Sequence, residues 1–182
     1  MGSSLSPMFL IAIPQLGDPN FARSVVLLLH HGSDGALGLV INHPSPLEIG
    51  SFASEHSLPC HSAVKGQNIF KGGPVEPSRG WILHGDESAK ERQSVMPGLF
   101  VSGSVETLSG LLADGAKPFK LLLGYAGWGP GQLEHEMEMG SWLTVEPGLK
   151  HVLQTPASET WTSVLRDMGV DPARLAVATG IH

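Results

Sequence analysis

The stretch VVLLLHHGSDGALGLVIN, residues 25–42, decides the fold prediction. Two apolar runs flank the segment HGSDG at residues 31–35, and such a glycine-containing segment that ends in Asp-Gly is typical of a hairpin connection. We therefore predict an antiparallel β-hairpin over Val25–Asn42. Val25–Leu29 is apolar at every position, which indicates a strand that is buried on both faces.

Further strands are expected where apolar, β-branched runs are bounded by glycine or proline. Together with the hairpin, the expected strands are Phe9–Ile13, Val25–His30, Ala36–Asn42, Gly80–His84, Leu99–Ser102, Phe119–Tyr125 and Trp142–Val145. The same pattern is missing from two polar windows, Ser57–Asn68 and Asp86–Pro97, which are expected to be exposed loops.

Helices are expected where apolar residues recur every three to four positions. Ser104–Ala113 places Val105, Leu108, Leu111 and Leu112 on one face, and Gln132–Met139 is a second helix. A third helix carries Trp161, Val164, Leu165 and Met168 behind a Ser158 cap and ends at Gly169. Its apolar face should pack on the outside of the sheet. Asp171-Pro172 predicts the start of a short terminal helix. Strands outnumber helices and do not alternate strictly with them, which favours a mixed α+β sheet.

The composition fits one domain over residues 1–182, because one core can serve up to ~250 residues. Eleven Lys+Arg against seventeen Asp+Glu give a net charge of −6, and the basic residues are scattered. This argues against direct DNA binding, since phosphate neutralisation supplies most of the affinity of such proteins. The single cysteine, Cys60, excludes an internal disulfide and suits a reducing compartment. No signal peptide and no apolar stretch of ~18 residues is found, so a cytoplasmic protein without a membrane span is expected.

The common catalytic and cofactor motifs are incomplete. GWGPG, residues 127–131, lacks the third glycine of a dinucleotide fingerprint and the lysine of a P-loop. His135-Glu136 begins like a zinc-protease motif, but position 139 is methionine. No G-x-S-x-G sequence occurs, and Cys60 beside His61 reads better as an exposed loop thiol than as a nucleophile. We therefore expect no metal and no cofactor.

Two loops carry residue types that loops seldom need. Asp18-Pro19 and Arg23 lie between the first two strands, and an arginine there suits a carboxylate or phosphate. KGGPV at residues 71–75, followed by Arg79-Gly80-Trp81, should bring backbone close to another element. Each loop is either a structural turn with a buried salt bridge or the edge of a cleft that holds an anion or a partner segment.

Five segments in this order and spacing resemble the AlgH-like family of bacterial proteins, also called YqgE-like. They are PQLGDPNFARSVV (14–26), GALGLVINHP (35–44), GGPVEPSRGWILH (72–84), GYAGWGPGQLEHEMEMGSWLTVEP (124–147) and W-x-x-V-L-R-x-M-G-V-D-P (161–172). Nothing family-like is found in Ser57–Asn68 or Asp86–Pro97. The resemblance implies a split, largely antiparallel β-sheet curled into a barrel-like core with peripheral helices. The family is biochemically uncharacterised, so no catalytic or cofactor residue is carried over. Its name comes from a proposed role in regulating alginate synthesis genes, and many members carry a transcriptional-regulator label.

Several positions typical of the family are glycines and prolines, which indicate backbone geometry. Five are not explained that way and are the candidate ligand- or partner-binding residues: Arg23, Asn42, His84, Trp128 and Gln132. The loop with Arg23 and the loop at Gly127–Gly131 are expected to frame one cleft, with Asn42 or His84 on its wall. The amides at the start of the helix after Gly131 would suit an anion, unless the carboxylate of Glu134 already satisfies them.

Three functions follow from these residues. The favoured one is a non-enzymatic regulatory or interaction domain that binds a protein partner or a small anionic ligand. The second is a DNA-binding regulator, which the charge opposes. The third is an enzyme for a small anionic substrate, with His84 as base, Arg23 for charge and the amides of Gly127–Gly131 for an oxyanion. The oligomeric state is left open.

Overall fold

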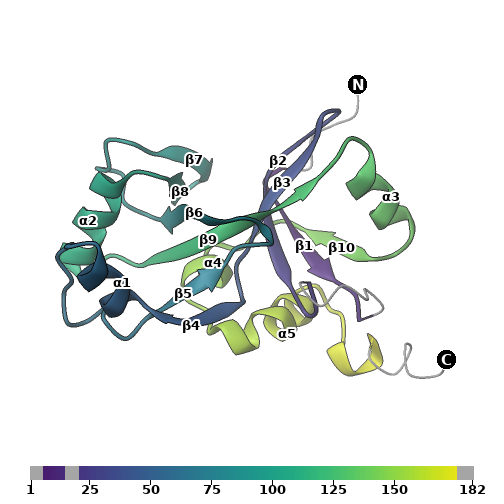
Figure 1. Cartoon of the computed structure of the whole chain (residues 1–182). Helices are drawn as coiled ribbons and strands as arrows, with labels where there is room; N and C mark the ends of the chain where they lie inside the picture. The colour runs from purple at the N-terminus through teal and green to yellow at the C-terminus, as the bar shows by residue number, and fades with distance from the viewer. Residues whose placement is uncertain (1–5, 15–20, 176–182) are drawn as a thin grey trace.

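The computed structural model describes residues 6–14 and 21–175 (Figure 1). In chain order the elements are β1 (Met8–Ala12), β2 (Val25–Gly32), β3 (Gly35–Val40), β4 (Pro44–Glu48), α1 (Ile49–Glu55), β5 (Asn68–Lys71), β6 (Val75–His84), β7 (Gln93–Met96), β8 (Leu99–Ser102), α2 (Val105–Asp114), β9 (Phe119–Trp128), α3 (Gln132–Glu138), β10 (Trp142–Val145), α4 (Leu149–Leu153) and α5 (Ala157–Asp167).

The strands form one split and curled sheet in the order β10-β1-β2-β3-β9-β6-β8-β7. These neighbours are antiparallel, while β5 runs parallel to β9 and pairs on its other side with β4. The first part of β9 pairs with β6, and its last part pairs with β3. Gly124, with φ at 79°, lies where β9 changes partners, and a Cβ there would overlap the Gly73 carbonyl. The predicted mixed, largely antiparallel and curled sheet with peripheral helices is confirmed.

The predicted hairpin is confirmed as β2 and β3, which pair from Val26 with Val40 to Gly32 with Gly35. A bulge between Leu28 and His30 shifts the register once. Val25–Leu28 are fully buried, as the apolar run predicts. Leu29 is only half-buried, because it faces a cavity described below.

The helices cover different parts of the sheet, α1 and α2 at one end and α4 and α5 along one face (Figure 1). Ser104 caps α2 through the Thr107 amide at 3.2 Å, and Gly115 ends it with φ at 74°. Leu108, Leu111 and Leu112 are buried as expected, whereas Val105 is 67% exposed because it lies on the outer side of the first turn. The expected inward position of Val105 is therefore wrong.

The predicted packing of the Trp161 helix is confirmed. Trp161 is 5% exposed and donates its indole N–H to the Ala12 carbonyl at 2.9 Å. This helix, α5, begins at Ala157 with Pro156 rather than Ser158 at its cap position. It is followed by Gly169 with φ at 78°, as predicted. The next helix begins at Pro172 and is capped by Asp171, and its end lies outside the described residues.

The sequence patterns missed three strands and two short helices, which are β4, β5, β7, α1 and α4. The helices α1 and α4 have seven and five residues, too few to show a helical periodicity. The missed strands PSPLE, NIFK and QSVM lack the run of apolar and β-branched residues that marks the similarly short strands β8 and β10. The window Asp86–Pro97 is a loop only in part, because β7 lies inside it. In the described part of the chain no helix is long and apolar enough to cross a bilayer.

Candidate functional site

His84, the proposed base, is fully buried at the end of β6. Its Nδ1 accepts the backbone N–H of Asp86 at 3.0 Å, so the proton of a neutral ring must sit on Nε2. Nε2 therefore donates to the Ser102 hydroxyl at 2.8 Å, and that hydroxyl donates to the Glu91 carbonyl at 2.6 Å. Burial lowers the pKa of His84, which keeps the ring neutral. His84 and Ser102 thus form a structural chain of hydrogen bonds and not a base with its nucleophile.

Asn42 and Arg23 hold the start of β2. Asn42 is buried, and its side chain accepts the Val25 N–H and donates to the Arg23 carbonyl, both at 2.9 Å. Arg23 has φ at 52°, in the left-handed region, and the clamp by Asn42 stabilises it there. The exposed Arg23 guanidinium lies over the Trp161 ring, 5.3 Å from its centroid.

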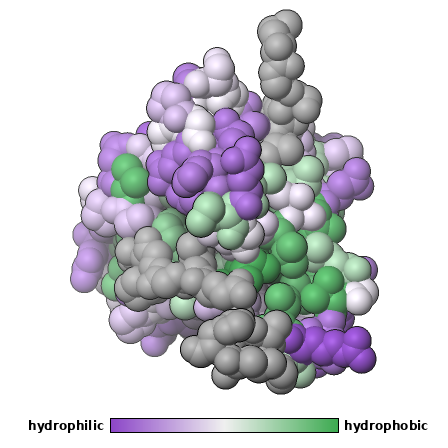
Figure 2. All heavy atoms as spheres, turned by 90° about the vertical axis from the view of Figure 1, so that its right-hand side faces the viewer, coloured by the Kyte–Doolittle hydropathy of each residue, from purple (hydrophilic) through white to green (hydrophobic). Residues whose placement is uncertain are grey.

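Trp128 and Gln132 belong to a network around Glu136. One carboxylate oxygen of Glu136 accepts the indole N–H groups of Trp128 at 3.1 Å and Trp142 at 2.9 Å. The other accepts the Gln132 amide at 2.9 Å, and Gln132 in turn accepts the Gly129 N–H at 3.0 Å. This network fastens α3 to the sheet. Figure 2 faces the side of the molecule that carries α3, where the upper half is mostly hydrophilic.

These five residues fall in three places: Arg23 with Asn42, Trp128 with Gln132, and His84 apart from both pairs. His84 pairs with Phe119 at one end of β9, and Trp128 is nine residues further along, about 30 Å at the usual rise of a strand. Phe21 stacks on Trp128, so the loop before β2 does approach that end, but Arg23 points to Trp161. Asp18 and Pro19 lie outside the described residues. A common cleft with His84 on its wall is therefore not formed.

The start of α3 already has an internal carboxylate. Glu134 accepts a hydrogen bond from His31 at 3.0 Å, and that bond together with the Glu134 backbone amide lowers the Glu134 pKa. No side-chain hydrogen bond caps the start of α3, so Glu134 does not close the amides there in the way the competing alternative required. Within the loop, the Gly129 N–H is taken up by Gln132. An anion site at Gly127–Gly131 therefore stays a prediction.

The second loop of the sequence analysis forms a cavity. Lys71, Gly73 and Pro74 line a cavity of about 520 Å³ between β4, β5 and the segment that leads into β6. Gly73 has φ at 155°, and a Cβ there would overlap the backbone of Tyr125, so this segment lies directly on β9. The expected close backbone approach is confirmed. The apolar side chains of the lining are Val40, Leu47, Phe70, Pro74, Pro77 and Leu123.

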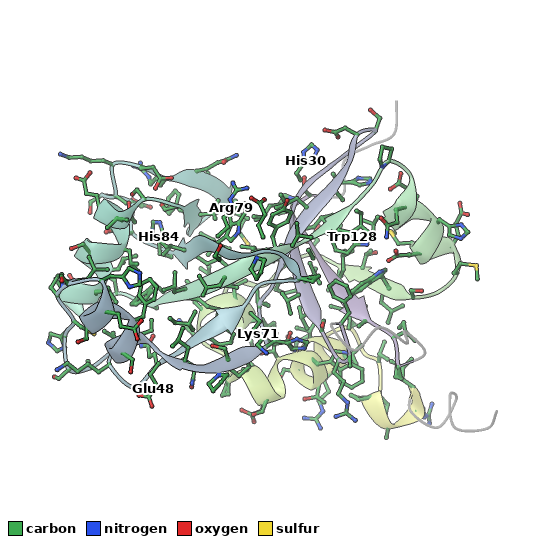
Figure 3. All side chains as sticks on the ribbon, viewed as in Figure 1. His30, Glu48, Lys71, Arg79, His84 and Trp128 are labelled. Atoms are coloured by element: carbon green, nitrogen blue, oxygen red, sulfur yellow. The ribbon has the colours of Figure 1, made fainter. Side chains whose placement is uncertain are left out.

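The ionisable side chains in this lining are both basic, Lys71 and His43 (Figure 3 labels Lys71). His43 Nε2 contacts the Ala22 carbonyl at 3.2 Å and the Ser24 hydroxyl at 3.3 Å, which places the ring proton on Nε2. Burial lowers the pKa of His43, and the charge of Lys71 lowers it further against the effect of the Ala22 carbonyl. At neutral pH the ring is uncharged, and Lys71 supplies the positive charge.

Lys120 adds a second ammonium group behind the cavity wall. It is 8% exposed, and its Nζ donates to the Ile41 carbonyl at 2.7 Å and lies 4.4 Å from the centroid of the Phe70 ring. Burial lowers the pKa of Lys120 to about 8, so it is still mainly protonated at pH 7. The cavity therefore combines apolar walls with positive potential, which suits an anion that has an apolar body.

The sequence analysis missed His43, Lys120 and Leu47 as parts of a site. His43 follows Asn42, which was singled out, and the pair Asn42-His43 was the available signal. Lys120 interrupts the apolar strand at 119–123, and a lysine at a buried strand position is itself unusual. No pattern in the sequence shows that these residues meet.

A family model, curated relatives and solved structures all match this chain over nearly its whole length. The AlgH-like family model matches residues 9–173. A UPF0301 protein from Myxococcus xanthus is 47% identical over 98% of this chain and 99% of its own length. One from Ruegeria pomeroyi is 37% identical over 97% and 98%. The solution structure of the AlgH protein from Pseudomonas aeruginosa superposes with a TM-score of 0.77 at 34% identity, covering 97% of this chain and 95% of that one. A crystal structure from Corynebacterium diphtheriae has a TM-score of 0.70 at 25% identity, with 91% and 88% covered.

Proposed function

The chain belongs to the AlgH-like family, and we propose that it is a non-enzymatic binding domain whose ligand is a small anion with an apolar body. The observation that carries this proposal is the cavity beside β5, where Lys71 and His43 stand among six apolar side chains. Such a setting fits a medium-chain carboxylate, whose head group would pair with the Lys71 ammonium while its chain covers Phe70 and Leu123.

The rim of the cavity supports a ligand rather than a purely structural hollow. Leu47 is 37% exposed, although it belongs to the cavity lining. An apolar chain in the cavity would cover that side chain and remove its surface from water, which contributes roughly 25 cal/mol per Å². Binding in this way needs no nucleophile and no general base.

The hydrogen bonds of the described residues also favour binding over catalysis. His84 is the buried histidine that the enzyme hypothesis needed, and its ring donates to Ser102 instead of accepting a proton from it. Regulation, as the family label suggests, would then follow from ligand occupancy. Direct DNA contact is not part of this proposal, because the net charge is −6.

Calorimetric titration with octanoate tests the proposal. Octanoate is expected to bind saturably, and at 100 times its dissociation constant to stabilise the fold by about 2.7 kcal/mol. Octanamide, which has the same chain without the charge, and inorganic phosphate, which has charge without the chain, are expected to bind at least tenfold more weakly.

Two lysine variants assign the binding to the cavity. Lys71→Met should lower the affinity for octanoate at least tenfold. Lys65→Met removes an exposed charge outside the lining and should leave that affinity unchanged. The proposal fails if octanoate shows no saturable binding, or if both variants bind it as the parent protein does.

A further inference from the structure

A second cavity lies between the β2–β3 hairpin and the strands β6, β7 and β8. Its volume is about 440 Å³, and its walls include Leu29 and His30 on one side and Ser94 and Val95 on the other. Figure 3 shows Arg79 and His30 on the two sides of this opening. The cavity thus lies between the two parts of the split sheet, β2 and β3 on one side and β6, β8 and β7 on the other.

A bulge in β6 aims Arg79 into this opening. Val75 pairs with Tyr125 and Gly80 with Leu123, so the intervening residues of β6 leave the ladder. Glu76, within the bulge, has φ at 45°, an unusual value for a non-glycine residue. Bulges often re-aim a side chain, and here the Arg79 guanidinium lies 4.3 Å from the centroid of the Trp81 ring and 5.8 Å from that of Tyr125.

Two polar side chains at this opening, Trp81 and Arg79, lack strong hydrogen-bond partners. Trp81 Nε1 is the one buried side-chain nitrogen or oxygen of the described residues that has no hydrogen-bond partner. A buried donor without an acceptor is unfavourable, because it has lost its hydrogen bond to water without gaining another. Arg79 meets Glu76 at 3.6 Å, longer than the ~2.7–2.9 Å of a charge-assisted hydrogen bond, and its side chain is half exposed. A carboxylate that enters the opening would pair with the exposed Arg79 guanidinium.

The neighbouring strand β7 also has backbone groups that can accept or donate hydrogen bonds. β7 is the last strand in the sheet order, and among the described residues no further strand pairs with its outer edge. Gln93 and Ser94 are exposed, and both line the cavity. Open edges of this kind accept an extended peptide as an added strand, with main-chain hydrogen bonds for affinity and side-chain pockets for specificity.

We propose that this opening binds an extended acidic peptide, which adds as a strand to β7 and places one carboxylate at Arg79. The guanidinium supplies the charge and a planar pair of donors. The apolar residues Leu29, Val95 and Val101 of the same lining receive the neighbouring side chains of the peptide. This site shares no lining residue with the octanoate cavity and does not rest on the function proposed there.

Selection from a displayed library of random twelve-residue peptides, with counter-selection on Arg79→Met, tests this site. Enriched peptides are expected to carry a glutamate or aspartate flanked by β-branched residues. A synthetic peptide of the enriched sequence should protect amides of residues 93–96 from hydrogen exchange. Replacing its acidic residue by the corresponding amide should weaken binding at least tenfold.

Conservative variants separate recognition from folding. Trp81→Phe keeps an aromatic ring beside the Arg79 guanidinium, and it is expected to leave the affinities for the peptide and for octanoate within about twofold of the parent. Arg79→Lys keeps the charge but loses the planar fork and should weaken peptide binding about fivefold or more, whereas Arg166→Lys on α5 should not. The proposal is overturned if no peptide is enriched, if enriched peptides bind Arg79→Met equally well, or if residues 93–96 gain no protection.

Discussion

Replacing Lys120 by methionine should stabilise the protein at neutral pH and remove a defined part of its pH dependence. The Lys120 pKa of about 8, against 10.5 for an unperturbed lysine, means that the folded state binds its proton about 2.5 units more weakly than the unfolded chain does. At 1.36 kcal/mol per unit this costs roughly 3 kcal/mol below pH 8. Methionine avoids that cost but leaves the Ile41 carbonyl without its donor, a loss of about 1–3 kcal/mol. The expected net gain at pH 7 is therefore small, about 1 kcal/mol.

The direction in which the free energy of unfolding changes with pH is the more discriminating measurement. Between pH 8 and pH 10.5 the unfolded chain holds the Lys120 proton while the folded protein has released it, so stability rises with pH in this window. From pH 7 to pH 10 the parent protein should gain about 2.5 kcal/mol from this group, and the variant should gain none of it. In a chain of this size that corresponds to about 5–10 °C in Tm.

Urea unfolding of both proteins at pH 7, 8, 9 and 10 measures this difference. Tyrosine, cysteine and the other lysines titrate in both proteins, so their contributions cancel in the difference. Lys65→Met, at an exposed position, serves as the control and should follow the parent curve at every pH. Parallel curves for the parent and Lys120→Met would refute the reasoning, because they would mean that Lys120 keeps its ordinary pKa in the folded state.

Three further outcomes follow from the contacts described above. Trp128→Ala should destabilise by about 3–5 kcal/mol in a denaturant titration, because it empties a buried site and removes a donor from Glu136; an unchanged midpoint would show that the ring is not part of the core. Asn42→Ala should cost about 1–3 kcal/mol, since the Val25 N–H and the Arg23 carbonyl lose their partner together, and a melt equal to that of the parent would contradict the clamp. Octanesulfonate, which stays ionised, should bind more tightly as the pH falls below 6.5, because a buried His43 with a lowered pKa becomes a second cation only there; calorimetry at pH 5 and pH 7.5 should show this gain, and His43→Gln should abolish it.

The sequence predicted the long elements because their patterns are local. The hairpin at Val25–Asn42 and the Trp161 helix each contain their own turn or stop signal, and both are found as expected. The strands β4, β5 and β7 carry polar residues and proline in place of an apolar run, and they depend on the pairing partners that the fold brings to them.

The candidate site was predicted only in part, since residue type does not reveal the partner of a side chain. Asn42, His84 and Gln132 look like functional residues in the sequence, yet each satisfies backbone or neighbouring groups inside the protein. Conversely, the KGGPV loop was noted for its glycines, and its cavity depends on His43 and Phe70, which come from other segments.

The bulge in β6 is a wall common to both cavities. Pro77 faces the one beside β5, and Arg79, two residues on, faces the one beside β7. If a ligand in the first cavity displaces Pro77, the chain that carries Arg79 two residues on would turn with it. The two binding free energies are then linked, and the factor by which octanoate changes the affinity for a peptide must equal the factor by which the peptide changes the affinity for octanoate. If both proposed sites are occupied in this way, the concentration of a small anion would set the occupancy of a peptide partner.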